Sequence, residues 1–259
     1  MIRALNTAAT GMEAQQTQID IIANNLANAN TVGFKKSRGE FQDLFYQQLR
    51  AASGGDGGTS APAGLEVGQG VKVAASQKMF TGGDMMQTNN HWDMAIEGGG
   101  FFEVRLPDGQ AAFTRVGSFK IRDGQVVTSN GYSLEPPIEV PDGYTQVEVS
   151  REGTVKVKLP DNDDLVQVGQ LQLAMVQNPA GLTSLGRGLF LANGASGSAV
   201  KGLPGSDGLG AIEHGFLESS NVKVVEEMID LISAQRAYEM NSKVIQAADQ
   251  MLRDAANIR

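Results

Sequence analysis

Apolar side chains recur every seven residues near the beginning of the chain. Residues 2–30 contain no proline and one glycine, and the spacing predicts a long helix with a narrow apolar face formed by Leu5, Met12, Ile19 and Leu26. The opposite side is rich in amides and hydroxyls where a solvated helix usually has Glu and Lys, which favours a helix surrounded by protein over an uncharged surface helix. We expect hydrogen bonds within or between packed helices from Asn24, Asn25 and Asn28.

The C-terminal segment shows the same repeat. From residue 221 onward no glycine or proline interrupts the chain, and Ser219, Ser220 and Asn221 are suitable N-cap residues at its start. The two helices would extend for about 45 and about 57 Å, which a domain of this size cannot cover, so their apolar faces are expected to pack against each other or against other chains. The apolar row consists of Val224, Leu231, Tyr238, Ile245 and Leu252, and a second row three residues further on includes Ala234, Asn241 and Ala248.

The middle of the chain changes to a period of two. Short alternating segments separated by glycine-containing turns predict antiparallel hairpins over residues 101–115, 119–128 and 144–159, with a further strand candidate at 167–177. The predicted fold class is α+β: long N- and C-terminal helices packed as a coiled-coil core domain, a central antiparallel all-β domain and an extended linker arm. The predicted boundaries are 1–34 for the N-terminal core helix, 35–72 for the arm, 73–210 for the β domain and 211–259 for the C-terminal core helix that pairs with the first.

Composition excludes several classes of protein. Glycine accounts for 32 of 259 residues and aromatic residues for 6%, which favours many tight turns over a densely aromatic ligand cleft. The formal net charge of −8 disfavours nonspecific binding to nucleic acid or anionic lipid. The absence of cysteine excludes disulfides, thiolate metal sites and cysteine nucleophiles. There is no apolar run of about 18 residues and no N-terminal signal-peptide pattern, so neither membrane insertion nor a cleaved signal is expected.

Patterns that would indicate catalysis or a bound cofactor are scarce. The sequence contains no phosphate-binding P-loop, no His-Glu-x-x-His zinc helix and no Gly-x-Ser-x-Gly elbow. The glycines at 98–100 precede a predicted strand rather than follow one, and the acidic turn at 161–164 lacks the glycine and distal Glu of a calcium loop. His91 beside Trp92 favours a packing corner over a general base or a sugar platform. The sequence therefore predicts no enzyme activity, no cofactor and no metal.

Two long motifs at the ends of the chain resemble those of bacterial flagellar rod and hook proteins. The first covers residues 22–35 and reads IANNLANANTVGFK, and the second begins with LESSNV at residue 217 and continues through the C-terminal helix. The whole chain is most similar to the distal rod members of this family. Segments that match those members in order are 87–90, 98–102, 106–109, 168–171 and 248–252.

The resemblance implies a structural subunit that assembles with copies of itself into a hollow, straight helical tube and transmits motor torque to the hook. In that family the terminal helices line the inner channel, the β domain lies outside, and an insertion, here about residues 46–71, packs between neighbouring subunits. The implied partners are the chain itself, proximal rod proteins and hook protein at the ends of the tube, and the P and L rings as a bushing, with no nucleic acid and no direct membrane insertion. The implied location is the flagellar basal body, where the rod crosses the periplasm after export without a cleaved signal peptide.

Two other functions remain as alternatives. The chain could be another flagellar axial protein, a proximal rod or hook subunit, although the segment at 46–71 favours rod over hook. A β domain that binds or cleaves cell-wall sugars would depend on His91, Trp92 and scattered carboxylates. For the rod function, the expected self-assembly residues are Leu5, Met12, Ile19, Asn24, Asn25, Leu26, Asn28, Val224, Leu231, Tyr238, Ile245 and Leu252.

Overall fold

The computed structural model of the chain describes residues 2–50, 64–160 and 164–257. Most of the glycine-rich part of the predicted arm, residues 53–64, and most of the acidic turn at 161–164 lie outside the described residues. The described residues form two compact units: the first combines residues 2–27, 37–50, 64–77 and 223–257, and the second combines residues 28–36, 78–160 and 164–222. The two terminal helices therefore belong to the same unit.

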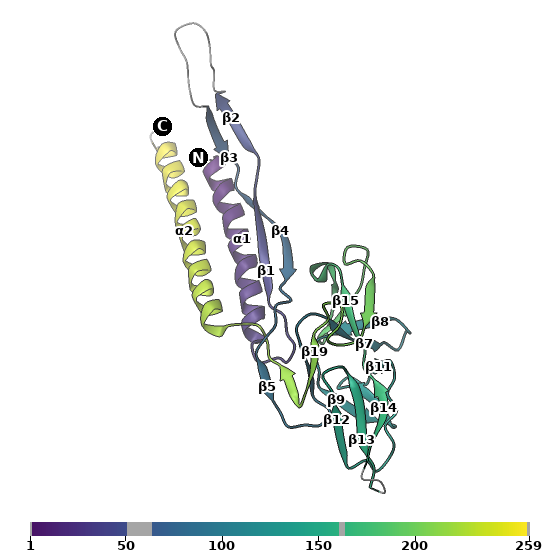
Figure 1. The fold of residues 1–259 in the computed structure, drawn as a ribbon. Helices are drawn as coiled ribbons and strands as arrows, with labels where there is room; N and C mark the ends of the chain where they lie inside the picture. The colour runs from purple at the N-terminus through teal and green to yellow at the C-terminus, as the bar shows by residue number, and fades with distance from the viewer. Residues whose placement is uncertain (1, 51–63, 161–163, 258–259) are drawn as a thin grey trace. The chain divides into compact units, whose positions relative to one another are not determined.

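Two long antiparallel helices that lie side by side form the basis of the first unit (Figure 1). A Cβ atom added to Gly11 of the first helix would lie 2.9 Å from Nδ2 of Asn241 in the second. Further along, Nδ2 of Asn25 donates a hydrogen bond of 3.1 Å to Oε2 of Glu227. These two pairs are fourteen residues apart on each helix, so the register is the same at both points. The elements of this unit are α1 (Ile2–Ala27), β1 (Ser37–Asp43), β2 (Tyr46–Arg50), β3 (Leu65–Gly68), β4 (Val71–Lys78) and α2 (Val224–Asn257).

Small side chains line the contact between the two helices. Ala234 and Ala248 of α2 are buried, as is Glu227, and all three lie on one seven-residue repeat with half-buried Asn241. Alanine and glycine allow the helix backbones to approach closely because they carry little or no side chain. Of the two rows in the C-terminal segment, the second is therefore the one buried on the α1 side. The buried residues of α1 are Ala8, Ala14, Ile22 and Asn25.

The turn between β3 and β4 is anchored to α1. The N–H of Val71 donates to Oγ1 of Thr10 at 3.4 Å. Gly70 precedes it with φ +118°, and a Cβ atom at this position would lie 2.2 Å from Oγ1 of Thr10. Glycine is required here for both reasons. On either side of this turn, β2 pairs antiparallel with β3, and β1 pairs with β4.

Gly70→Ala is expected to lower the free energy of unfolding of the first unit by about 1–3 kcal/mol, because a side chain adds backbone strain and displaces Thr10. Urea unfolding followed by far-ultraviolet circular dichroism of the helices measures this change. Gly70→Ala made in a Thr10→Ala background is the control, since the Oγ1 atom that the added Cβ would meet is then absent. Equal losses in the two backgrounds would contradict the role of the Thr10 contact.

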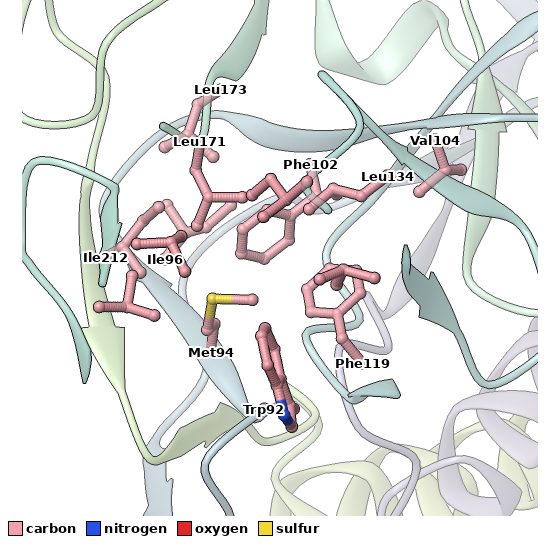
Figure 2. Close-up of a cluster of buried hydrophobic side chains, with 14 of the residues drawn as sticks. Trp92, Met94, Ile96, Phe102, Val104, Phe119, Leu134, Leu171, Leu173 and Ile212 are labelled. Atoms are coloured by element: carbon pink, nitrogen blue, oxygen red, sulfur yellow. The ribbon is translucent and has the colours of Figure 1, made fainter. Parts of the chain in front are cut away.

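Short strands around an apolar core make up the second unit (Figure 2). The ring of Phe102 meets that of Phe119 edge to face, with centroids 5.1 Å apart, and Met94 points toward both. Trp92 is 7% exposed, and its Nε1 donates to the hydroxyl of Tyr144 at 3.1 Å. This bond satisfies the indole N–H inside the core.

The strands of the second unit pair mainly as antiparallel hairpins. The largest sheet of the described residues has the order β16-β17-β8-β7-β11-β10-β9, with β15 joined to β7 and β18 joined to β15. A short 3-10 helix covers Pro179–Gly181. The strands are β5 (Met85–Gln87), β6 (Met94–Glu97), β7 (Phe101–Arg105), β8 (Ala111–Thr114), β9 (Phe119–Arg122), β10 (Gln125–Thr128), β11 (Ser133–Glu135), β12 (Gln146–Val149), β13 (Thr154–Lys158), β14 (Leu165–Gln170), β15 (Leu173–Val176), β16 (Thr183–Gly186), β17 (Leu189–Leu191), β18 (Ala199–Gly202), β19 (Ala211–His214) and β20 (Phe216–Glu218).

The three predicted hairpins are present as β7 with β8, β9 with β10, and β12 with β13. Asp123 and Gly124 both have positive φ, as the two-residue turn between β9 and β10 requires. The predicted single strand at 167–177 is wrong, because the chain divides there into β14 and β15. Between them the buried Leu171 donates its N–H to the carbonyl of Gly153 at 2.7 Å. The α+β class and the central antiparallel β-rich region agree with the sequence prediction.

Candidate functional site

The self-assembly residues expected from the sequence have different environments in the single chain. On α1, Asn25 is buried and Asn24 is exposed, while Asn28, which follows the helix, is half-buried. On α2, Val224, Tyr238 and Leu252 are exposed. The remaining members of the set are half-buried: Leu5, Met12, Ile19, Leu26, Leu231 and Ile245.

A second apolar face of α2 did not emerge from the sequence. Val225, Ile229 and Met240 are 71%, 62% and 61% exposed. At 100° per residue they lie on the side of the helix opposite Ala234 and Asn241. Apolar residues at positions i, i+4 and i+7 would have revealed this face. The row of apolar residues that begins with Val224 and repeats every seven positions was the stronger pattern. The helix is therefore apolar on two sides, of which only one faces α1.

Asn25 connects three elements of the first unit. Its Nδ2 donates to the carbonyl of Ser37 at 2.9 Å and to Oε2 of Glu227 at 3.1 Å, and its Oδ1 accepts the N–H of Ser37 at 2.9 Å. The side chain thus satisfies both backbone groups of Ser37, which begins β1. The last part of α1 is thereby joined to the first residue of β1 and to the first turn of α2.

The N-cap prediction at 219–221 is wrong. The helix begins at Val224, and the N–H of Glu227 donates to the carbonyl of Lys223 at 3.0 Å, which places the cap at Lys223. Glu227 lies in the first turn, where a negative charge is favoured by the helix dipole. Asn221 consequently lies outside the helix and is available for contacts in the second unit.

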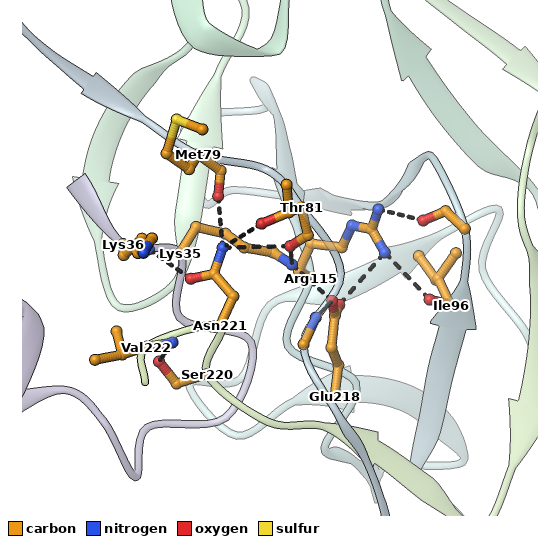
Figure 3. Close-up of polar contacts among 12 residues, drawn as sticks. Lys35, Lys36, Met79, Thr81, Ile96, Arg115, Glu218, Ser220, Asn221 and Val222 are labelled. Carbon is orange, nitrogen blue, oxygen red and sulfur yellow. Dashed lines mark hydrogen bonds and ion pairs between the residues drawn. The ribbon is translucent and has the colours of Figure 1, made fainter. Parts of the chain in front are cut away.

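A buried ion cluster in the second unit brings together Lys35, Arg115 and Glu218 (Figure 3). Nζ of Lys35 lies 2.6 Å from Oε1 of Glu218, and Nη1 of Arg115 lies 3.3 Å from its Oε2. The three side chains are 0%, 3% and 1% exposed, respectively. One carboxylate therefore lies between two cations away from water.

Backbone groups complete the cluster. Lys35 donates to the carbonyl of Thr81 at 2.7 Å, and the N–H of Gly83 donates to Oε1 of Glu218 at 2.9 Å. Arg115 donates to the carbonyls of Ile96 and Gly98 at 3.2 and 2.6 Å. These bonds supply further partners for the buried charges, although the buried Nε of Arg115 has none. Sequence reasoning did not single out the cluster, although its Lys and Glu lie in the two terminal motifs.

Burial is the main influence on the two cations of the cluster. It lowers the pKa of Lys35 and of Arg115 from their ordinary values, and the charge of Glu218 opposes the change in both cases. The carboxylate therefore offsets part of the cost of burying the two cations.

The residues of the alternative sugar-binding hypothesis do not form a binding platform. Trp92 lies in the core, where its ring cannot stack on a sugar. His91 and His214 stack with centroids 6.4 Å apart, and Nε2 of His214 bonds to the carbonyl of His91 at 2.9 Å. Within the described ranges, His, Asp and Glu form no group of three able to hold a metal ion. In the same ranges, none of the helices is long and apolar enough to cross a membrane.

Comparisons with known proteins cover the chain from end to end. Three protein-family models match: flagella basal body rod protein at residues 5–35, flagellar hook protein FlgE/F/G D1 domain at 95–157, and flagellar basal body rod FlgEFG protein C-terminal at 213–258. The flagellar basal-body rod protein FlgG of Borreliella burgdorferi is 49% identical over all of this chain and 99% of its own length. Its counterparts in Caulobacter vibrioides and Bacillus subtilis are 45% and 33% identical, with full coverage of both chains. The chain belongs to the family of flagellar basal-body rod proteins.

Proposed function

We propose that this chain is a structural subunit of the flagellar distal rod, which assembles with copies of itself into a straight, hollow tube and transmits torque to the hook. The observation that carries the proposal is the similarity to flagellar basal-body rod proteins along the entire chain, at 49% and 45% identity. Identity at this level includes both terminal motifs and the β-rich middle. No separate catalytic role is assigned to the second unit.

The exposed apolar face of α2 supports assembly. Val225, Ile229 and Met240 are all more than half exposed on one side of α2, where an isolated surface helix usually carries polar residues. Neighbouring subunits would cover this face and the exposed part of the row at Val224 and Tyr238. We propose the same self-assembly role for the twelve residues expected from the sequence, and we add the second apolar face of α2 to them.

The finer parts of the proposal concern partners and location. The rod would contact proximal rod proteins and hook protein at its ends and the P and L rings around it. It would cross the periplasm as part of the basal body after export without a cleaved signal peptide. Residues 46–50 and 65–68 pair as strands and carry exposed Tyr46, Leu49 and Leu65, which suits packing between subunits.

Electron microscopy of the purified protein under assembling conditions tests the proposal. Straight tubes are the expected result. Curved tubes would assign the chain to the hook instead, and a protein that stays monomeric at all concentrations would contradict self-assembly. Restoration of swimming in a bacterium that lacks its own distal rod protein provides the second readout, with a proximal-rod deletion strain as the control that should not be rescued.

A further inference from the structure

Asn221 lies where the chain repeatedly enters and leaves the second unit. The chain passes between the units after residues 27, 36, 77 and 222. Asn221 immediately precedes the last of these passages. Its side chain contacts Lys36, beside the passage after residue 36, and Met79, beside the passage after residue 77 (Figure 3). All these residues belong to the second unit.

Both ends of the side-chain amide of Asn221 form hydrogen bonds. Oδ1 accepts the N–H of Lys36 at 2.7 Å. Nδ2 donates to the carbonyl of Met79 at 2.8 Å, and also lies 3.3 Å from the carbonyl and 3.0 Å from Oγ1 of Thr81. The partners are 140 to 185 positions away in the sequence, so the contact is not a local turn.

Backbone hydrogen bonds join the same three segments. The N–H of Met79 donates to the carbonyl of Lys36 at 2.9 Å, and the N–H of Asn221 donates to the carbonyl of Phe34 at 3.4 Å. Close packing accompanies them, because a Cβ atom at Gly83 would lie 2.0 Å from the carbonyl oxygen of Ser219. The segments therefore have little room to slide past one another.

We infer that Asn221 is a positioning residue that joins three chain passages into a single joint on the second unit. Without its side chain, the segments at 34–36, 79–81 and 219–222 would keep only the backbone hydrogen bonds above and the contacts of Lys35, so each would move more independently of the other two. With it, a force on one passage is shared by the other two. The joint is inferred from the contacts alone. Its importance for transmitting torque rests on the proposed function.

The chemistry of the joint requires an amide. Aspartate could still accept from Lys36, but it cannot donate to Met79, and its charge would face carbonyl oxygens. Serine is uncharged but too short to reach both sides. Asn221→Asp is therefore the sharp test, and Asn221→Ser is a milder variant in case the first fails to fold.

Amide hydrogen exchange in the full-length protein measures the joint directly. In Asn221→Asp we expect the N–H groups of Lys36 and Met79 to exchange about tenfold faster or more, while those of Phe102 and Val104 in β7 keep their rates. A loss of overall stability would instead accelerate all four. Unchanged exchange at Lys36 and Met79, or equal acceleration of the β7 amides, would overturn the inference.

Asn193→Asp is the matched control. Asn193 also uses both ends of its amide, but its partners, Gly181, Thr183, Ala195 and Ser196, are all within twelve positions of it. This variant should leave the amide exchange rates of Lys36 and Met79 unchanged. Faster exchange at these two residues would contradict the inference that Asn221 in particular holds them.

The parent protein provides a measurement that needs no variant. If the passages form one joint, the amides of Lys36 and Met79 should show the same opening free energy, and a large difference between them would overturn the proposal. A parent that exchanges as expected but never forms tubes would contradict the proposed function and leave the joint intact.

Discussion

Glu218→Gln should be among the most damaging single substitutions in the second unit, with an expected loss of about 3–5 kcal/mol in the free energy of unfolding. The change leaves the shape of the side chain nearly intact but removes the negative charge between Lys35 and Arg115. Two cations would then remain buried without a counter-charge. Urea unfolding followed by tryptophan fluorescence measures the loss, because the chain has one tryptophan and it lies in the core of this unit.

Two further variants separate the effect of charge from that of shape. Glu103→Gln is the matched control, since this buried carboxylate pairs with Lys201, which is 49% exposed and can be solvated when the pair is lost. We expect it to cost about 1 kcal/mol. Lys35→Met should cost less than Glu218→Gln because it leaves one cation opposite one anion. If Glu218→Gln and Glu103→Gln lowered the free energy of unfolding by the same amount, the stabilising role of the ion cluster would be contradicted.

Ile229→Asp should abolish swimming while leaving the isolated chain folded. In the single chain this side chain is 62% exposed, so the carboxylate is solvated and costs little. If a neighbouring subunit covers the position, the unpaired charge becomes buried at a cost of at least several kcal/mol per subunit. Motility in soft agar and microscopy of assembled rods measure the effect, and far-ultraviolet circular dichroism of the helices together with tryptophan fluorescence shows whether both units still fold. Leu26→Asp and Ile245→Asp should also prevent assembly, but both positions are half-buried in the chain itself.

Gln246→Asp is the control for the charge alone. Gln246 is exposed on α2, and its neighbours one turn away are all polar: Ser242, Lys243, Asp249 and Gln250. The variant adds the same negative charge to the same helix and should swim. Normal swimming of the Ile229→Asp strain would show that this face is not covered in the rod, and loss of swimming in both strains would point to the added charge itself.

Local sequence signals predicted most of the elements. The hairpin at Asp123 and Gly124 follows from residues that accept positive φ, and the two helices follow from a long apolar repeat without glycine or proline. What the repeat could not decide is which row of α2 would face α1. Alanines at 234 and 248 are weakly apolar and are easily overlooked beside Leu231 and Ile245, yet their small size allows close approach.

The ion cluster could not be predicted because its members are far apart in sequence. Glu218 lies 183 positions from Lys35 and 103 from Arg115, and charged side chains usually lie on the surface. The same applies to Asn221, whose position before a helix suggested a cap. Only the tertiary fold brings Lys36, Met79 and Thr81 to its amide.

The separation between Lys35 and Glu218 in the sequence also affects when their contact forms during folding. In a chain that emerges from its N-terminus, Lys35 appears 183 positions before the carboxylate that neutralises it. Loop closure over that distance is slow and entropically unfavourable until the strands between have formed. The ion pair is therefore a late contact, and the second unit cannot be completed before nearly the whole polypeptide is available.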